Sequence, residues 1–181
     1  FPALTLNIFA TENAVDTSGS EIDVAIRYGP EPTSNSDEIG LYQEYYVGAA
    51  CKTLIQEGRA PRIEALTKQR LIDVRWENSI LTAPSWKIWF KENGSKDYEI
   101  FRRMSFDAYN LAFDALKRGH GAALLSRTIV KSDEFDEDFV QLEGPQLPGY
   151  HYRVIRSPSA MRKRAVRQFV DWLVETATLR C

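Results

Sequence analysis

The sequence has few of the residues that usually carry catalysis or bind metal ions. Its 181 residues include only two cysteines and two histidines. Cys51 and Cys181 have neither the spacing of metal ligands nor a second pair that would indicate a disulfide framework. His120 and His151 have no nearby nucleophile or carboxylate that indicates a catalytic triad, and no phosphate-loop or zinc motif appears. We therefore predict no cofactor, no metal site and no enzymatic activity.

An excess of charge and a long apolar run are also lacking. The formal net charge at pH 7 is −2, so the chain has no basic excess for binding nucleic acid directly. No apolar run approaches the roughly 20 residues that a membrane-spanning helix needs. Cys51 lies in an apolar run and is interpreted as a small buried side chain, which favours a reduced cytoplasmic setting. The sequence opens on Phe1 rather than on methionine, and we expect a fragment or a processed product.

The clearest strand pattern is residues 22–29, Ile-Asp-Val-Ala-Ile-Arg-Tyr-Gly. Apolar and β-branched residues dominate this stretch, which ends at a Gly29-Pro30 pair. Such a run is typical of a strand buried on both faces of a parallel sheet. Ligands of open α/β sheets collect at the carboxyl ends of the strands. Tyr28 is therefore a candidate site residue.

Strand and helix patterns alternate along the rest of the chain, as in α/β proteins. Alternating or continuous apolar runs predict strands over 4–10, 22–29, 39–51, 71–76, 98–104, 122–125 and 150–155. Apolar residues spaced three and four apart predict helices over 61–68, 84–93, 105–118 and 158–177. The last helix is the strongest, because Met161, Ala165, Phe169 and Leu173 form one apolar row.

The run 39–51 is too long for one compact sheet, since strands usually have about five or six residues. We interpret it as a strand that leaves one lobe, crosses a hinge at Val47 and Gly48, and enters a second lobe. The strand 150–155 is interpreted as the return crossing, with Val154 at the second hinge. The predicted subdomains are 1–46 plus 152–181 and 47–151. Two crossings and an open cleft are typical of a venus-flytrap binding domain.

Five stretches in this order resemble a known family. The first is a strand that follows Phe-Pro-Ala-Leu at 1–4, and the second is the strand 22–29. The other three are the Trp-x-x-Trp helix at 86–89, the Gly-His-Gly-Ala-Ala-Leu-Leu run at 119–125, and Phe-Val-Asp-Trp-Leu at 169–173. Together they are similar to the effector-binding domain of LysR-type transcriptional regulators, over essentially the whole chain. The resemblance is greatest to the subgroup that includes the glycine-cleavage activator and the β-lactamase regulator.

The resemblance implies a two-lobed α/β fold of the type 2 periplasmic-binding-protein kind, with two small sheets flanked by helices. It also implies assembly as homodimers or homotetramers, and DNA binding only through an N-terminal winged helix-turn-helix that this chain lacks. The chain begins about one strand and one helix later than the family's first lobe. We therefore expect apolar surface on the segment Leu4–Phe9 to be uncovered unless another chain covers it.

Several loops are expected to converge on an effector cleft, at Thr11, Glu12, Tyr28, Asn78, Ser79, Ser105, Phe106, Asp107 and Tyr152. A helix that begins near Ser105 would offer free N–H groups and a partial positive charge to a ligand carboxylate or phosphate. Alternatively, Ser105 or Asp107 caps that helix, Thr11 and Glu12 form a plain turn, and Tyr152 packs at the hinge.

The sequence therefore predicts the cytoplasmic sensory part of a bacterial LysR-type transcription factor. It would bind a small polar metabolite between its lobes and relay binding to an attached DNA-binding domain. Family-like dimers would pack the helix around Tyr109 against the first lobe of the partner. The alternatives are a solute-binding protein of a transport system and, less strongly supported, an enzyme on the same fold.

Overall fold

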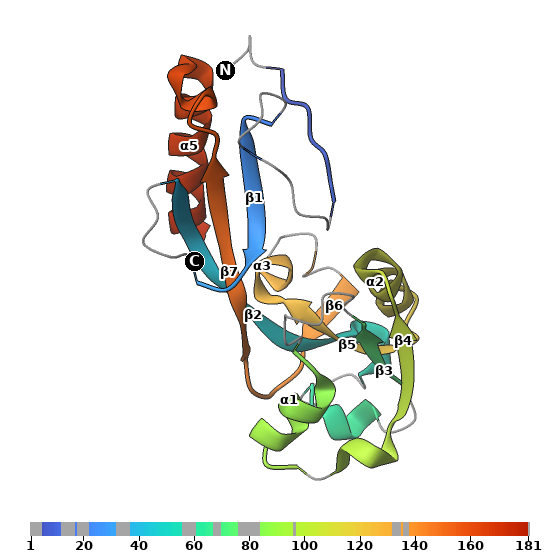
Figure 1. The fold of residues 1–181 in the computed structure, drawn as a ribbon. Coiled ribbons are helices and arrows are strands. Elements are labelled where there is room, and N and C mark those ends of the chain that lie inside the picture. Colours follow the sequence, from blue (N-terminus) through green and yellow to red (C-terminus); the bar gives the residue numbers. More distant parts are fainter. Residues whose placement is uncertain are drawn as a thin grey trace. The chain divides into compact units, whose positions relative to one another are not determined.

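The computed structural model describes residues 5–11, 17, 22–31, 37–55, 61–66, 70–75, 84–95, 97–131, 135 and 138–180. The chain is divided into two compact units (Figure 1). Unit 1 consists of Phe1–Gln43 and Tyr150–Cys181, and unit 2 consists of Glu44–Gly149. Both passages from one unit to the other lie within strands, β2 (Glu38–Cys51) and β7 (Leu147–Arg156).

The remaining elements belong to one unit each. Unit 1 also contains β1 (Val24–Gly29), the 3-10 turn η4 (Ala160–Arg162) and the helix α5 (Arg164–Arg180). Unit 2 also contains η1 (Lys52–Leu54), η2 (Ile63–Leu66), β3 (Arg70–Val74), α1 (Trp86–Glu92), η3 (Asp97–Ile100), β4 (Arg102–Phe106), α2 (Tyr109–Lys117), β5 (Gly121–Ser126), α3 (Arg127–Val130) and β6 (Phe139–Gln141).

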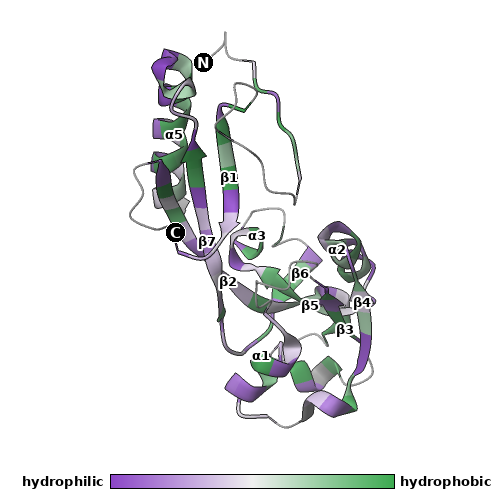
Figure 2. Ribbon diagram, in the orientation of Figure 1, coloured by the Kyte–Doolittle hydropathy of each residue, from purple (hydrophilic) through white to green (hydrophobic). Residues whose placement is uncertain are grey.

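In unit 1, α5 packs against a group of neighbouring strands. β1 pairs antiparallel with β7 along its whole length, and β7 lies beside β2. The prediction of a parallel strand buried on both faces over 22–29 is therefore wrong, because β1 is antiparallel, lies at the end of the strand order and leaves Ile26 49% exposed. Val166 and Val170 of α5 pack with the fully buried Val154 of β7. α5 carries both apolar and polar residues, as Figure 2 shows. Its apolar residues recur every three or four positions, as the sequence predicted, and pack against the strands.

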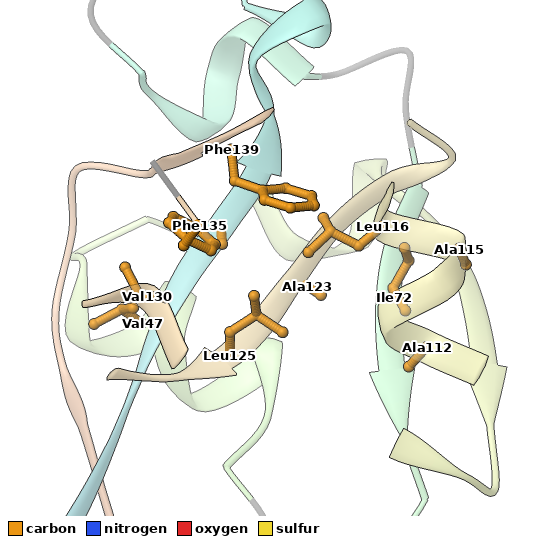
Figure 3. Close-up of a cluster of buried hydrophobic side chains, with 11 residues drawn as sticks. Val47, Ile72, Ala112, Ala115, Leu116, Ala123, Leu125, Val130, Phe135 and Phe139 are labelled. Carbon is orange, nitrogen blue, oxygen red and sulfur yellow. The ribbon is translucent and has the colours of Figure 1, made fainter. Parts of the chain in front are cut away.

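In unit 2, three strands run in the same direction. β3 lies between β4 and β5 and is parallel to both, whereas β2 pairs antiparallel with β5 and β6. α2 connects β4 to β5, and its residues Ala112, Ala115 and Leu116 pack with Ile72 and Leu125 of the sheet (Figure 3). This arrangement is the parallel β-α-β unit expected of an α/β protein.

A second buried cluster of unit 2 is built on α1. Trp86 and Trp89 are fully buried, and their ring centroids are 5.4 Å apart. The indole Nε1 of Trp86 donates a hydrogen bond to the Ile72 carbonyl oxygen at 3.1 Å. Ser85 caps the helix through its side chain. The helix predicted over 84–93 is therefore confirmed as α1.

Two glycines of the run 119–125 have structural roles. Gly119 has a φ of +70° just after α2, where the sequence predicted a glycine cap. A Cβ atom at Gly121 would overlap the Arg70 carbonyl oxygen. β5 can therefore lie this close to β3 only because residue 121 has no side chain.

The strand predicted over 4–10 is wrong for the residues of this segment that the structure describes. Residues 5–11 form neither helix nor strand, and Leu6, Ile8 and Phe9 are 55%, 86% and 78% exposed. Apolar alternation produces a strand only where a neighbouring strand supplies hydrogen bonds. The expectation that this segment leaves apolar surface uncovered is confirmed for these three side chains.

Two predicted helices also differ from the structure. The helix expected over 105–118 begins only at Tyr109, because Ser105 and Phe106 are held extended in β4 by their pairing with β3. The helix expected over 61–68 is the single 3-10 turn η2 within the described residues. The long strand predicted over 39–51 is confirmed as β2.

Candidate functional site

The carboxyl ends of β3, β4 and β5 meet at one edge of unit 2, because the three strands are parallel. β4 ends at Phe106 and β5 ends at Ser126. The predicted site residues Ser105, Phe106 and Asp107 lie at this edge, and Ser105 and Asp107 are exposed there. This edge is the position at which the sequence predicted ligand contacts.

The N-terminus of α2 opens at the same edge. Its N-cap is Ala108, which provides no side-chain hydrogen bond to the first turn. The alternative in which Ser105 or Asp107 caps the helix is therefore not supported. Backbone N–H groups at the start of a helix lack intrahelical partners and carry a partial positive charge. The start of α2 can accept an anionic group of a ligand.

A buried carboxylate, Glu44, lies near this edge and was missed by the sequence predictions. The side chain of Glu44 is only 2% exposed. Its Oε2 accepts hydrogen bonds from Ser126 Oγ at 2.7 Å and Thr128 Oγ1 at 3.2 Å, and its Oε1 accepts one from the Tyr45 backbone N–H at 2.9 Å. The available signal was a single acidic residue inside the otherwise uncharged run 39–51.

Tyr109, the first residue of α2, has a buried hydroxyl. Among the described residues, this hydroxyl has no hydrogen-bond partner of good geometry. Burial raises the pKa of Tyr109 to about 12, the nearby backbone of Ser126 opposes the shift, and the charge of Glu44 adds to it. The hydroxyl therefore stays protonated at neutral pH and remains a potential hydrogen-bond donor.

Asp73 and Arg103 lie on the paired strands β3 and β4. Asp73 pairs in register with Ser105. Burial raises the pKa of the Asp73 carboxyl, and the Arg103 guanidinium partly offsets this effect. Arg103 also donates a hydrogen bond to the Tyr98 hydroxyl at 2.8 Å. These side chains bring both charge signs close to the edge.

In unit 1, β1 pairing brings the predicted residues Tyr28 and Tyr152 together. They are opposite each other in the register of β1 and β7, and their ring centroids are 5.0 Å apart. Tyr150 and Tyr42 extend the group, with centroids 5.7 Å from Tyr28 and 5.1 Å from Tyr152, respectively. The Tyr28 hydroxyl accepts a hydrogen bond from the Tyr150 N–H at 2.9 Å. These four half-buried residues, the tyrosine group, form an aromatic surface at the end of β1.

The other predicted site residues lie elsewhere. Thr11 ends the exposed segment 5–11, whereas Glu12, Asn78 and Ser79 lie outside the residues that the structure describes.

The residues predicted as hinges are all within strands. Val47 and Gly48 lie in β2 on the unit 2 side of the Gln43–Glu44 boundary, and Val47 is part of the unit 2 core. Val154 belongs to the buried core of unit 1. The chain changes unit at Gln43–Glu44 and again at Gly149–Tyr150.

The described parts of the chain contain no group of three or more His, Cys, Asp or Glu side chains suited to holding a metal ion. None of the helices in these parts combines the length and apolarity that a bilayer span requires.

Residues 1–178 match the family model of the LysR substrate binding domain. The chain belongs to the LysR substrate binding domain family. The HTH-type transcriptional activator AmpR of Pseudomonas aeruginosa is 22% identical to this chain over 179 residues. That match covers 98% of this chain but 58% of AmpR, so the chain spans less than two thirds of that regulator.

Solved structures of regulators in this family share the fold. The effector domain of P. aeruginosa AmpR has a TM-score of 0.71 at 21% identity, covering 98% of this chain and 83% of that domain. The effector binding domain of Citrobacter freundii AmpR has a TM-score of 0.67 at 23% identity, covering 98% and 85%. Full-length AphB, a virulence activator of Vibrio cholerae, has a TM-score of 0.59 at 16% identity, covering 98% and 59%.

These findings confirm two expectations from the sequence. The fold is the type 2 periplasmic-binding-protein-like α/β fold of LysR effector domains. One detail of the prediction is wrong: two small sheets were expected, but the long strand β2 pairs with both β7 and β5, so the described strands form one hydrogen-bonded sheet. The family is that of LysR-type regulators, as the resemblance implied. The alternative of a transport solute-binding protein gains no support, because the relatives named above are transcription regulators.

Proposed function

We propose that this LysR-family domain senses a small polar metabolite in the cytoplasm and relays its binding to the DNA-binding domain of a full-length regulator. Family membership supports the sensory role, since the matching AmpR and AphB proteins are transcriptional activators. It also supports binding rather than catalysis as the function of the chain. The ligand contacts are proposed from the local geometry of each unit.

The single observation that carries this proposal is the uncapped start of α2 at the carboxyl edge of a parallel sheet. Ala108 gives the first turn no side-chain acceptor, and exposed Ser105 and Asp107 flank it. A ligand carboxylate or phosphate can take the place of a capping oxygen and gain from the helix dipole. The proposed effector therefore carries at least one anionic group.

The tyrosine group of unit 1 is proposed as a second contact surface for the effector. Its rings provide apolar contact area, and phenol hydroxyls provide hydrogen bonds at the rim. Tyr28 and Tyr152 remain the proposed contact residues, together with Thr11, Glu12, Asn78 and Ser79 from the sequence prediction. The proposed hinges stay in the crossing strands, at Val47 and Gly48 in β2 and at Val154 in β7.

The proposed anion contact can be tested by filling the cap position. In Ala108→Asp, a fixed carboxylate would satisfy the first-turn N–H groups and compete with the ligand. Isothermal titration with inorganic phosphate and small mono- and dicarboxylates should show binding to the original chain that is weakened at least tenfold in this variant, a loss of about 1.4 kcal/mol.

The matched control is Asn93→Asp, which adds the same charge at the C-terminal end of α1, another helix of unit 2. This variant should bind the same anions with unchanged affinity. Absence of binding to every anion, or equal affinity in Ala108→Asp and the original chain, would contradict the proposed anion contact.

We also propose that the domain assembles as a dimer or tetramer, with α2 of one protomer packed against unit 1 of its partner. This assembly is the one that the resemblance to LysR-type regulators implied, and the exposed apolar side chains of Leu6, Ile8 and Phe9 in unit 1 support a contact there. Light scattering at high protein concentration should give at least twice the monomer mass. A monomer mass at every concentration would contradict the proposal.

A further inference from the structure

The buried Glu44 lies where β2 leaves unit 2. The pairing of β2 with β5 ends at Tyr46 opposite Ser126. Glu44 lies beyond this last pair and is the first residue of unit 2 after the Gln43–Glu44 boundary. Its carboxylate nevertheless accepts hydrogen bonds from the Ser126 hydroxyl at the end of β5 and from the Thr128 hydroxyl in α3. Side-chain hydrogen bonds of Glu44 therefore hold β2 to the end of β5 beyond the last backbone pair, Tyr46–Ser126.

Burying a carboxylate in this position adds little stability, because removing its charge from water costs free energy. Glu44 and Ser157 are the buried polar residues in the described parts of the chain, and of these only Glu44 is acidic. No cation forms a salt bridge with Glu44 within those parts. Replacing buried ionic groups with apolar ones is often neutral or stabilising, so a buried carboxylate is better explained by a specific arrangement that it enforces. Here the carboxylate is satisfied only when β2, Ser126 and Thr128 are in register.

The same carboxylate acts on the start of α2. Its negative charge adds to burial in raising the pKa of Tyr109. Glu44 is therefore hydrogen-bonded to the end of β5 and to Thr128 of α3, and its charge acts on the first residue of α2.

We propose that Glu44 is a positioning residue that fixes the point at which β2 leaves unit 2, by fastening this strand to the Ser126 and Thr128 hydroxyls at the ligand edge. A change at this edge that draws either hydroxyl away releases β2 at its crossing. The fastening is a property of unit 2 and goes beyond the proposed ligand contact at α2. Its test needs no ligand.

The test is amide hydrogen exchange of the full chain, measured by mass spectrometry for peptides that cover residues 43–46. Glu44→Gln removes the charge and one acceptor at nearly constant size, and Thr128→Val removes one donor. Each variant should accelerate exchange in this segment on the order of tenfold, since a charge-assisted hydrogen bond contributes about that factor. Because both variants weaken the same hydrogen bond between Thr128 and residue 44, their effects should not add, and the double variant should exchange no more than about twice as fast as the faster single variant.

Two controls separate positioning from general destabilisation. Thr128→Ser keeps the hydroxyl and should restore slow exchange. Thr178→Val removes a threonine hydroxyl that bonds to the Val174 carbonyl oxygen within α5 and should leave 43–46 unchanged. Unchanged exchange at 43–46 in both Glu44→Gln and Thr128→Val would overturn the proposal. Equal acceleration in every strand of unit 2 would also overturn it, because that result indicates only a loss of stability.

Discussion

The described tryptophans of unit 2 are buried, whereas the tryptophan of unit 1 is half exposed. Trp86 and Trp89 in unit 2 are completely buried against the sheet. In unit 1, Ile26 and Trp172 are about half exposed, at 49% and 50%, and the apolar segment 5–11 is open. Unit 2 therefore has a closed core of its own, and unit 1 has apolar surface that further contacts can cover. We therefore expect packing within unit 2 to contribute more to the free energy of unfolding than packing within unit 1.

The largest expected difference in stability is between the loss of a tryptophan in unit 2 and the loss of one in unit 1. Trp86→Ala should lower the free energy of unfolding by about 3–5 kcal/mol, because it leaves a cavity in a closed core. Trp172→Ala should lower it by only about 0.5 kcal/mol, because half of that side chain is already in water. Urea unfolding followed by circular dichroism measures both. Equal losses would remove the distinction between the two units.

A glycine in each unit gives a sharper comparison of packing. Gly121→Ala should cost about 2 kcal/mol, because the new Cβ atom would overlap the backbone of Arg70 and force β5 away from β3. Gly29→Ala should cost less, about 0.5 kcal/mol. Its Cβ atom would press on the Arg153 guanidinium at 3.3 Å rather than overlap a backbone atom, although that guanidinium is held by the Pro30 carbonyl oxygen and Glu38. The same urea titrations compare the two variants, and an equal loss in Gly29→Ala would show that unit 1 is as tightly packed as unit 2.

A smaller effect is expected from the half-buried Asp73 of unit 2. Burial raises its pKa in the folded state above the ordinary value, with Arg103 opposing. The folded state therefore binds this proton more tightly than the unfolded chain does. The contribution of Asp73 to stability should be most favourable below the ordinary pKa of aspartate and should decrease as the pH rises through the raised value.

Asp73→Asn tests this pH dependence, because asparagine does not titrate. The variant should be more stable than the original chain near pH 7, and this advantage should shrink at pH 4. Urea unfolding at the two pH values provides the measurement. An advantage that is the same at both values would exclude titration of Asp73 as the cause.

The smallest effect on stability is expected in the open segment of unit 1. Phe9→Ser should leave the free energy of unfolding unchanged, because the side chain is already exposed, but it should reduce self-association of the chain. Analytical ultracentrifugation measures the association. The control is Ile100→Ser, which removes an exposed apolar side chain from unit 2. If Ile100→Ser reduces association equally, the open segment has no special part in it.

The sequence predicted those elements whose patterns are local. The long β2 and the amphipathic α5 were found because their apolar residues recur along a single element. The segment 5–11 was misassigned because a strand needs a neighbour, and its alternating pattern does not say whether one is present. The start of α2 was placed too early because pairing of β4 with β3 keeps Ser105 and Phe106 extended.

The candidate site was only partly predictable. Tyr28 could be proposed because it lies at the end of an expected strand, and Asp107 because it lies at the start of an expected helix. Glu44, Ser126 and Thr128 could not be grouped, because Glu44 is separated from its partners by more than 80 residues and only the fold brings them together. The tyrosine group likewise depends on the register between β1 and β7.

The central claim, that this LysR-family domain binds an anionic ligand at the start of α2, is tested most directly by nuclear magnetic resonance. Backbone amide signals of the full chain would be followed during titration with inorganic phosphate and then with any carboxylate that binds. The account predicts saturable shifts in the amides of Asp107, Tyr109 and Asn110, which disappear in Ala108→Asp. Saturable shifts elsewhere, with these three amides unchanged, would contradict it.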